Sequence, residues 1–127
     1  MKLLVDTHFL LWAATGQLTG KAAKLLSNPA HQLHFSAASL WEVAIKSGMG
    51  RSDFDFDAQL LRRGLVDAGY LEVPVTASHA AAVASLPPLH KDPFDRMLLV
   101  QAASEGLELV TNDRLLGRYA GFPVRVL

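Results

Sequence analysis

The sequence predicts an α/β fold in which a central parallel sheet of about four to five strands is flanked by helices on both faces. Short apolar runs typical of buried parallel strands, such as Leu3-Leu4-Val5, alternate along the chain with segments of helical periodicity. Strands that alternate with helices favour parallel pairing through right-handed crossover connections. The 127 residues, 50% of them apolar, suit one compact domain over residues 1–127.

Helix-stop and turn residues divide the first half of the chain. An apolar strand ends at Asp6, and apolar residues at helical spacing follow at once. Asn28-Pro29 stops a short helix, and the glycines around Met49 stop a longer one. Residues 52–57 alternate acidic and aromatic side chains, but the helix that follows favours an irregular link over a strand. The predicted elements are a strand ending at Val5, helices over 7–14 and 21–26, a strand over 31–36, and helices over 37–46 and 57–68.

The second half contains the most strongly patterned helix, which opens at Asp92-Pro93 and ends before Gly106. It is apolar nearly all round, which is typical of a buried helix. Pro74 suits an edge position for the strand that contains it, because proline cannot donate to a central ladder. The predicted elements are a strand over 71–75, a helix over 76–85, the buried helix, a strand over 107–111, a short helix over 113–119 and a strand over 124–127.

The composition excludes several classes of protein. The chain has no cysteine, so it can form neither disulfides nor thiolate metal sites. The formal net charge is zero, so nucleic-acid binding would depend on local patches. We find neither an apolar run of about 18 residues nor a basic-then-apolar leader before Asp6, and therefore expect no membrane span and no signal peptide. These features together suit a cytoplasmic protein.

Four acidic residues stand at comparable places, and each has an ordinary explanation as a helix cap. Asp6 ends the first strand, Glu42 lies about one turn into a helix, Asp95 is in the first turn of the buried helix, and Asp113 follows a strand. Ser39 and Glu42 have the spacing of a capping box. Taken singly, each acid is better explained as a cap.

Their expected positions favour a shared site. The strands before Asp6 and Asp113 have the composition of central strands, so their ends should be neighbours, and Asp95 heads a buried helix. Crowded carboxylates in a low-dielectric place repel one another and take up protons unless a cation neutralises them. Magnesium and manganese prefer carboxylate oxygen and water as ligands. The pattern therefore points to a divalent-metal site.

Other polar residues are less specific. The five histidines lack zinc-site spacing, and most are expected at the surface or in caps. Thr111 and Asn112 could support a metal-bound water or simply form a turn. Lys46 and Arg96, like Arg51 and Lys91, could contact phosphates or remain solvated charges. Trp12 and Trp41 have helical core spacing, so both are expected to pack in the interior.

Four blocks of sequence resemble the PIN-domain ribonucleases of the VapC toxin type. They occur in the family's order, and together they are far more specific than any one block. The blocks are Asp6–Trp12, Ser36–Lys46, His90–Leu98 and Leu109–Asp113.

The resemblance implies a magnesium- or manganese-dependent endoribonuclease that a cognate VapB-like antitoxin holds inactive, commonly as a dimer. It assigns metal binding and catalysis to Asp6, Glu42, Asp95 and Asp113, and leaves Asp92 as a helix cap. In the expected reaction, ions held by Asp6 and Asp95 orient and deprotonate a water that hydrolyses an RNA phosphodiester. Glu42 and Asp113 are expected to support these ions.

Two alternatives remain open at this point. The first is a PIN-fold binding module whose acids serve only structure, which calorimetry should find unable to bind metal. The second is a phosphotransfer domain with a nucleophilic aspartate at Asp6. Haloacid-dehalogenase phosphatases would have another aspartate two positions further on, where this chain has His8.

Overall fold

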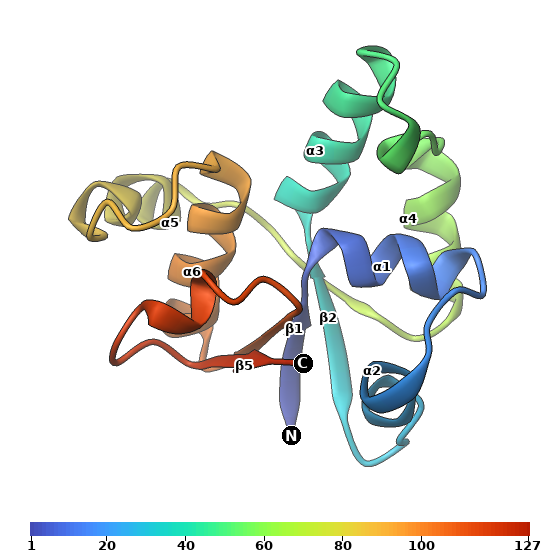
Figure 1. Ribbon diagram of the computed structural model, residues 1–127, viewed down its shortest axis with the longest axis horizontal. Helices are drawn as coiled ribbons and strands as arrows, with labels where there is room; N and C mark the ends of the chain where they lie inside the picture. Colours follow the sequence, from blue (N-terminus) through green and yellow to red (C-terminus); the bar gives the residue numbers. More distant parts are fainter.

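A computed structural model describes residues 1–127 and contains one sheet of five parallel strands in the order β3-β2-β1-β4-β5 (Figure 1). From the central β1 the chain moves outward through β2 to β3, then returns to form β4 and β5 on the other side of β1. The predicted parallel sheet is confirmed. The strands are β1 (Lys2–Val5), β2 (Gln32–Ser36), β3 (Leu71–Val73), β4 (Glu108–Thr111) and β5 (Val124–Val126).

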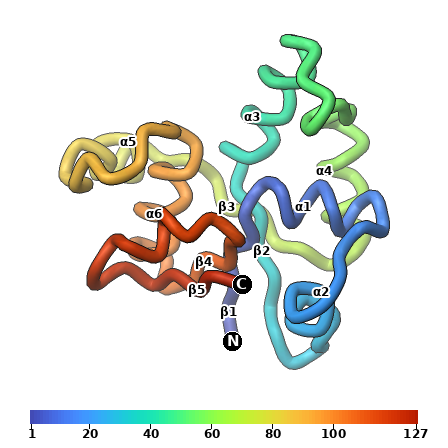
Figure 2. The backbone as a smooth tube through the Cα atoms, in the orientation of Figure 1, coloured from blue at the N-terminus to red at the C-terminus, as the bar shows by residue number.

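Helices cover both faces of the sheet and enclose two cores (Figures 1 and 2). Leu3 and Val5 of β1 pack on the side of α1, α2 and α4, whereas Leu4 packs on the side of α6. This alternation is expected, because successive strand residues point to opposite faces. The helices are α1 (Thr7–Ala14), α2 (Gly20–Leu26), α3 (Ala37–Gly48), α4 (Ala58–Asp67), α5 (Ala77–Ala82) and α6 (Pro93–Glu105).

Helix α6 has the buried character and the boundaries that its sequence predicts. Asp92 caps its first turn by accepting the backbone N–H groups of Phe94 and Asp95, and Pro93 occupies the first helical position. Gly106 ends the helix with a φ of 68°, a left-handed conformation that favours glycine. Residues 98–102 are all buried.

Several elements are shorter than predicted. β3 ends at Val73 because Pro74 has no N–H to continue the ladder. The helix predicted over 76–85 ends at Ala82 and continues only as the 3₁₀ turn η2 (Val83–Ser85). Residues 52–57 form the expected irregular link, which contains the 3₁₀ turn η1 (Ser52–Phe54).

The prediction of a helix over 113–119 was wrong, since this stretch contains only the 3₁₀ turn η3 (Leu116–Arg118). The Asp113 carboxylate accepts the backbone N–H of Leu115, two residues on, which offers the chain a local alternative to a helical turn. Gly117 also lies so close to β5 that an added Cβ would come within 2.8 Å of Val126. The segment is therefore a compact turn packed against the sheet.

The expectation that both tryptophans pack in the interior was wrong for Trp41. This residue is 65% exposed, and its ring contacts the Phe94 ring of α6 edge-on at 5.5 Å between centroids. Trp12 is partly buried and packs against Phe9 in the same manner. None of the helices combines the length and the apolar character needed to cross a bilayer.

Candidate active site

The four acids predicted from the sequence all lie at the carboxyl edge of the sheet, at its centre. Asp6 directly follows β1, Asp113 follows the neighbouring β4, and Glu42 belongs to the helix that follows β2. Asp95 joins them because α6 runs antiparallel to the strands, so that its first turn lies at their carboxyl ends. The strand order reverses at β1, and such a switch point is where open α/β sheets bind ligands.

Asp6 is both a helix cap and a buried member of the cluster. One carboxylate oxygen accepts the backbone N–H of Phe9, and the other accepts the hydroxyl of Thr111 at 2.5 Å. The residue is only 4% exposed. Burial raises the pKa of Asp6 above its ordinary value, although both hydrogen bonds oppose this change. The capping role and the site role therefore coexist.

Glu42 is 3% exposed and is held by groups from two helices. The Thr7 hydroxyl donates to its Oε1 at 2.6 Å, and Lys46 Nζ lies 2.5 Å from its Oε2. The capping box considered for Ser39 and Glu42 is absent, because Ser36 is the N-cap of α3. Glu42 thus lies in the cluster for reasons other than capping.

Asp95 has the most informative charge environment. Burial raises its pKa to about 7, and the negative charges of Asp92, Glu42 and Asp6 add to the effect. These charges reach Asp95 from three different elements, which identifies a common cluster. The protonated form of Asp95 therefore persists to a higher pH than in an exposed aspartate. The site holds more negative charge than its surroundings stabilise.

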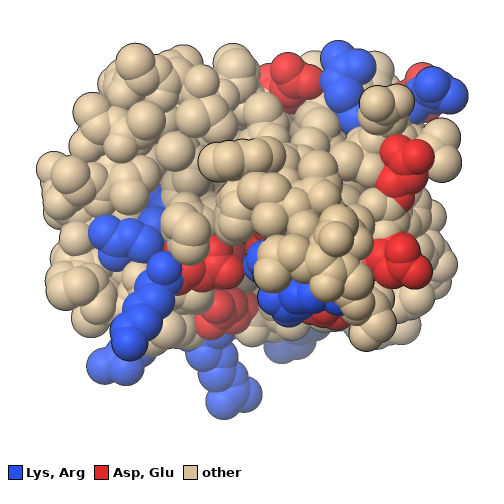
Figure 3. Space-filling model, turned by 90° about the horizontal axis from the view of Figure 1, so that it is seen from above, with Lys and Arg blue, Asp and Glu red and all other residues tan.

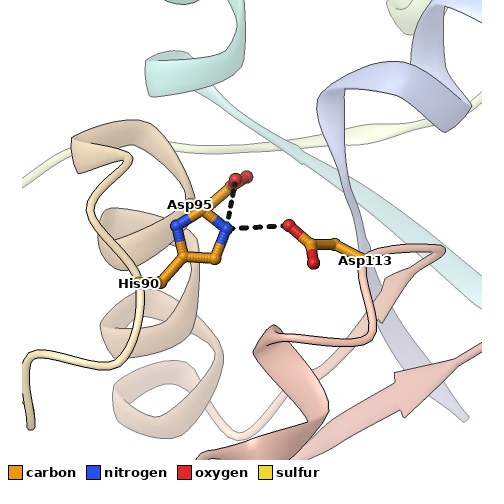
Figure 4. A group of neighbouring side chains, drawn as sticks. All are labelled: His90, Asp95 and Asp113. Carbon is orange, nitrogen blue, oxygen red and sulfur yellow. Dashed lines mark hydrogen bonds and ion pairs between the residues drawn. The ribbon is translucent and has the colours of Figure 1, made fainter.

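His90, which the sequence analysis expected at the surface or in a cap, lies between two of the acids (Figure 4). Its Nε2 is 2.7 Å from Asp113 Oδ2 and 3.3 Å from Asp95 Oδ2. Each of these three residues offers one possible metal-ligand atom, and the three atoms lie within 4.8 Å of one another. The sequence feature that could have indicated this position is that His90 begins the block His90–Leu98, two residues before the N-cap Asp92.

The remaining predicted residues fall into two groups. Thr111 lies in the site, since it donates to Asp6 and accepts the backbone N–H of Asp113. Lys46 also lies there, 3.6 Å from Asp92 in addition to its contact with Glu42. Asn112 is exposed and lines a hollow beside α1 and α2. Arg96 donates to the backbone carbonyls of Pro87, His90 and Val83.

Figure 3 looks onto this edge of the molecule and shows acidic side chains gathered beside Lys and Arg side chains. Two cations are already paired, Lys46 with Glu42 and Arg51 with Asp53. Three exposed cations, which follow His90, Asp113 and Gly117 in the chain, make no ion pair. They are Lys91, Arg114 and Arg118.

Residues 3–121 match the family model of the PIN domain. A comparison with curated proteins found no match.

Among solved structures, the chain is similar over its whole length to one in VapBC2 from Rickettsia felis bound to a promoter DNA fragment. The TM-score is 0.75 at 15% identity, with 100% of this chain and 99% of that chain covered. DNA-bound VapBC from Salmonella typhimurium gives 0.70 at 17% identity, covering 99% and 98%. A toxin–antitoxin complex from Klebsiella pneumoniae gives 0.65 at 22% identity, covering 98% and 96%. At these identities the similarity shows a shared fold.

Proposed function

Because the chain belongs to the PIN domain family, we propose that it is a magnesium- or manganese-dependent endoribonuclease that acts as the toxin of a toxin–antitoxin pair. The observation that carries the proposal is the excess of buried negative charge at the carboxyl edge of the sheet. Asp6 and Asp95 both have raised pKa values there, with Glu42 beside them. A helix cap does not require several carboxylates close together, whereas a bound cation would reduce the repulsion between them.

The donor set fits a hard divalent ion. Carboxylate oxygens of Asp6, Asp95, Glu42 and Asp113 would hold it, and the chain supplies no sulfur ligand. When bound, the ion would make a water molecule more acidic and offset negative charge on the phosphate that the water attacks. Where Asp95 is protonated, its proton would leave as the ion binds.

The chain's own residues fix the orientation of these carboxylates. Thr111 and Thr7 direct their hydroxyls at Asp6 and Glu42, so each carboxylate is held in one rotamer. Lys46 balances part of the charge on Glu42. Such supporting hydrogen bonds matter because a hydrolytic site depends on the placement of its ligands.

The RNA backbone requires cations that are not already engaged. Lys46 is paired with Glu42, and the Arg96 guanidinium is bonded to carbonyls, so phosphate contact by these two residues remains only a prediction. Lys91, Arg114 and Arg118 are exposed and make no ion pair, and the first two directly follow His90 and Asp113 in the chain. We therefore expect the substrate to approach across these three residues.

The same proposal includes a small VapB-like antitoxin as partner, a homodimer and a toxin–antitoxin hetero-oligomer in the cytoplasm. The names of the solved neighbours, two VapBC complexes and one toxin–antitoxin complex, support the antitoxin. Two hollows meet at Trp12 and offer places for an apolar segment of such a partner. One, of about 590 Å³, is lined in part by Phe9 and Leu18, and the other, of about 400 Å³, by Phe54 and Phe56.

The two alternatives make different demands on the site. A phosphotransfer enzyme needs an accessible nucleophilic carboxylate, but Asp6 is 4% exposed and both of its oxygens accept hydrogen bonds. A pure binding module has no need of crowded acids with raised pKa values, and it should bind no divalent ion.

The test is RNA cleavage by the purified full chain with magnesium, manganese or EDTA, alongside Asp6→Asn. We expect metal-dependent cleavage that EDTA and Asp6→Asn both abolish. Asp57→Asn is the matched control, because Asp57 caps α4 outside the cluster and asparagine caps a helix about equally well. Cleavage that persists after exhaustive chelation, or full activity in Asp6→Asn, would refute the proposal.

A further inference from the structure

His90 is fixed at its backbone on both sides. Its N–H donates to the Tyr119 hydroxyl at 2.9 Å, and that hydroxyl in turn donates to the carbonyl of Pro87. Its own carbonyl accepts Nη1 of Arg96 at 3.2 Å. The loop that carries His90 is therefore attached to α6 and to the segment after η3. This attachment fixes the backbone position from which the imidazole extends.

A second contact defines which ring nitrogen carries the proton. The backbone N–H of Asp92 points at His90 Nδ1, with 3.0 Å between the two nitrogens. A backbone amide can only donate, so Nδ1 must be the acceptor and must be unprotonated. The proton of the neutral ring is then on Nε2, the atom that faces the two carboxylates.

We infer that His90 is a positioning residue that donates its Nε2–H to Asp113 and keeps this carboxylate beside Asp95, and that it is not a metal ligand. A protonated Nε2 has no free lone pair to offer a cation, and the Asp92 amide already uses the lone pair of Nδ1. The inference rests on the proposed metal-dependent function. It adds that the ion is held by oxygen alone.

The two carboxylates beside His90 differ in their surroundings. The side chain of Asp113 is 37% exposed and follows a strand in an irregular turn, whereas Asp95 is set in the first turn of α6. Two nearby carboxylates repel each other, and a neutral N–H donor between them reduces that repulsion without occupying a ligand position. Hydrogen-bond partners behind metal ligands typically contribute a factor of 10–100 in metal affinity.

Two substitutions separate the roles of the two ring nitrogens. The amide nitrogen of His90→Gln can reach the position of Nε2 and donate to Asp113. The oxygen of His90→Asn can replace Nδ1 as acceptor of the Asp92 amide but cannot reach the carboxylates. A donor role therefore predicts that glutamine restores function and asparagine does not, although both are neutral amides.

The experiment measures manganese affinity of the full chain by calorimetry and the nitrogen coupling of bound manganese by electron spin-echo spectroscopy. We expect affinity within about 3-fold of the unsubstituted protein for His90→Gln, a loss of about 10- to 100-fold for His90→Asn, and no histidine nitrogen coupled to the ion. ¹⁵N NMR of the metal-free protein should show the proton on Nε2.

Three results would overturn the inference: a histidine nitrogen coupled to manganese, a proton on Nδ1, or equal affinities for the two variants. If the unsubstituted protein binds no divalent ion, the proposed function fails instead. The NMR measurement still decides the donor role in that case, since it needs no metal. A fold defect would be recognised by melting curves, and it would affect glutamine and asparagine alike.

Discussion

Asp95→Asn should make the metal-free protein more stable at alkaline pH. Its pKa is raised from 3.8 to about 7 in the folded chain, mainly by burial and then by the charges of Asp92 and Glu42. Between about pH 4 and pH 7, Asp95 therefore keeps its proton in the folded state, whereas in the unfolded chain it has lost it. Since the folded state binds more protons, the free energy of unfolding must fall as pH rises from about 4 to 7, and it stays low above that range.

The size of the effect follows from the size of the pKa change. A change of about 3 units at about 1.36 kcal/mol per unit gives an upper bound of about 4 kcal/mol. The Asp95 side chain is 21% exposed, so solvent screening reduces this figure, and we expect about 2–4 kcal/mol at pH 8. Asparagine removes the charge and keeps a carbonyl oxygen beside the Nε2–H of His90. For a domain of this size the gain corresponds to roughly 10 °C in Tm.

The assay is thermal unfolding in EDTA from pH 5 to pH 9, followed by circular dichroism. Asp95→Asn should melt above the unsubstituted protein at pH 8, and the difference should shrink toward pH 5. Asp57→Asn, which retains the cap of α4, should follow the unsubstituted protein throughout. An equal or lower Tm for Asp95→Asn at pH 8 would show that the negative charge of Asp95 does not destabilise the folded chain. The charge excess that supports a cation site would then be absent.

Three further predictions concern activity and binding. RNA cleavage should rise with pH through the region near 7 as Asp95 loses its proton, and an activity that falls with pH there would contradict this assignment. In the Asp6→Asn background, Lys91→Ser with Arg114→Ser should weaken RNA binding and reduce the slope of log affinity against log salt by about 0.7 per lost contact. The control is Arg62→Ser, which removes a cation paired with Glu72, and equal slopes would exclude the proposed RNA path. An antitoxin peptide should lay an apolar segment near Phe9, Trp12 and residues 54–56 and insert an Arg or Lys toward Asp6 and Asp95. Its alanine variant should bind modestly less well and release RNase activity at high magnesium, so equal inhibition by both peptides would indicate a steric block.

The sequence predicts those features that depend on local patterns. The buried α6 follows from apolar residues all round it and from Asp92-Pro93 at its start, and the sheet follows from short apolar runs between helices. The convergence of Asp6, Glu42, Asp95 and Asp113 could also be inferred, because parallel strands align their carboxyl ends at one edge. In each of these cases the pattern along the chain constrains the position in space.

The features that were missed depend on contacts between distant segments. His90 acquires its role because the loop before α6 meets the turn after β4, and nothing in the spacing of residues 90 and 113 encodes that meeting. The segment 113–119 forms no helix because Asp113 caps locally and Gly117 packs on β5. Trp41 has the spacing of a core residue, yet it is exposed, and among aromatic rings it contacts only that of Phe94 in α6.

The central claim is that the acidic cluster binds a divalent ion, and a calorimetric titration with manganese in buffers of different ionisation enthalpy tests it most directly. At pH 6 we expect binding with release of about one proton per ion, because Asp95 is then mostly protonated, and much less release at pH 9. Asp6→Asn and Asp95→Asn should each weaken the binding strongly. If the unsubstituted protein shows no binding, or binding that neither substitution changes, the cluster is not a metal centre.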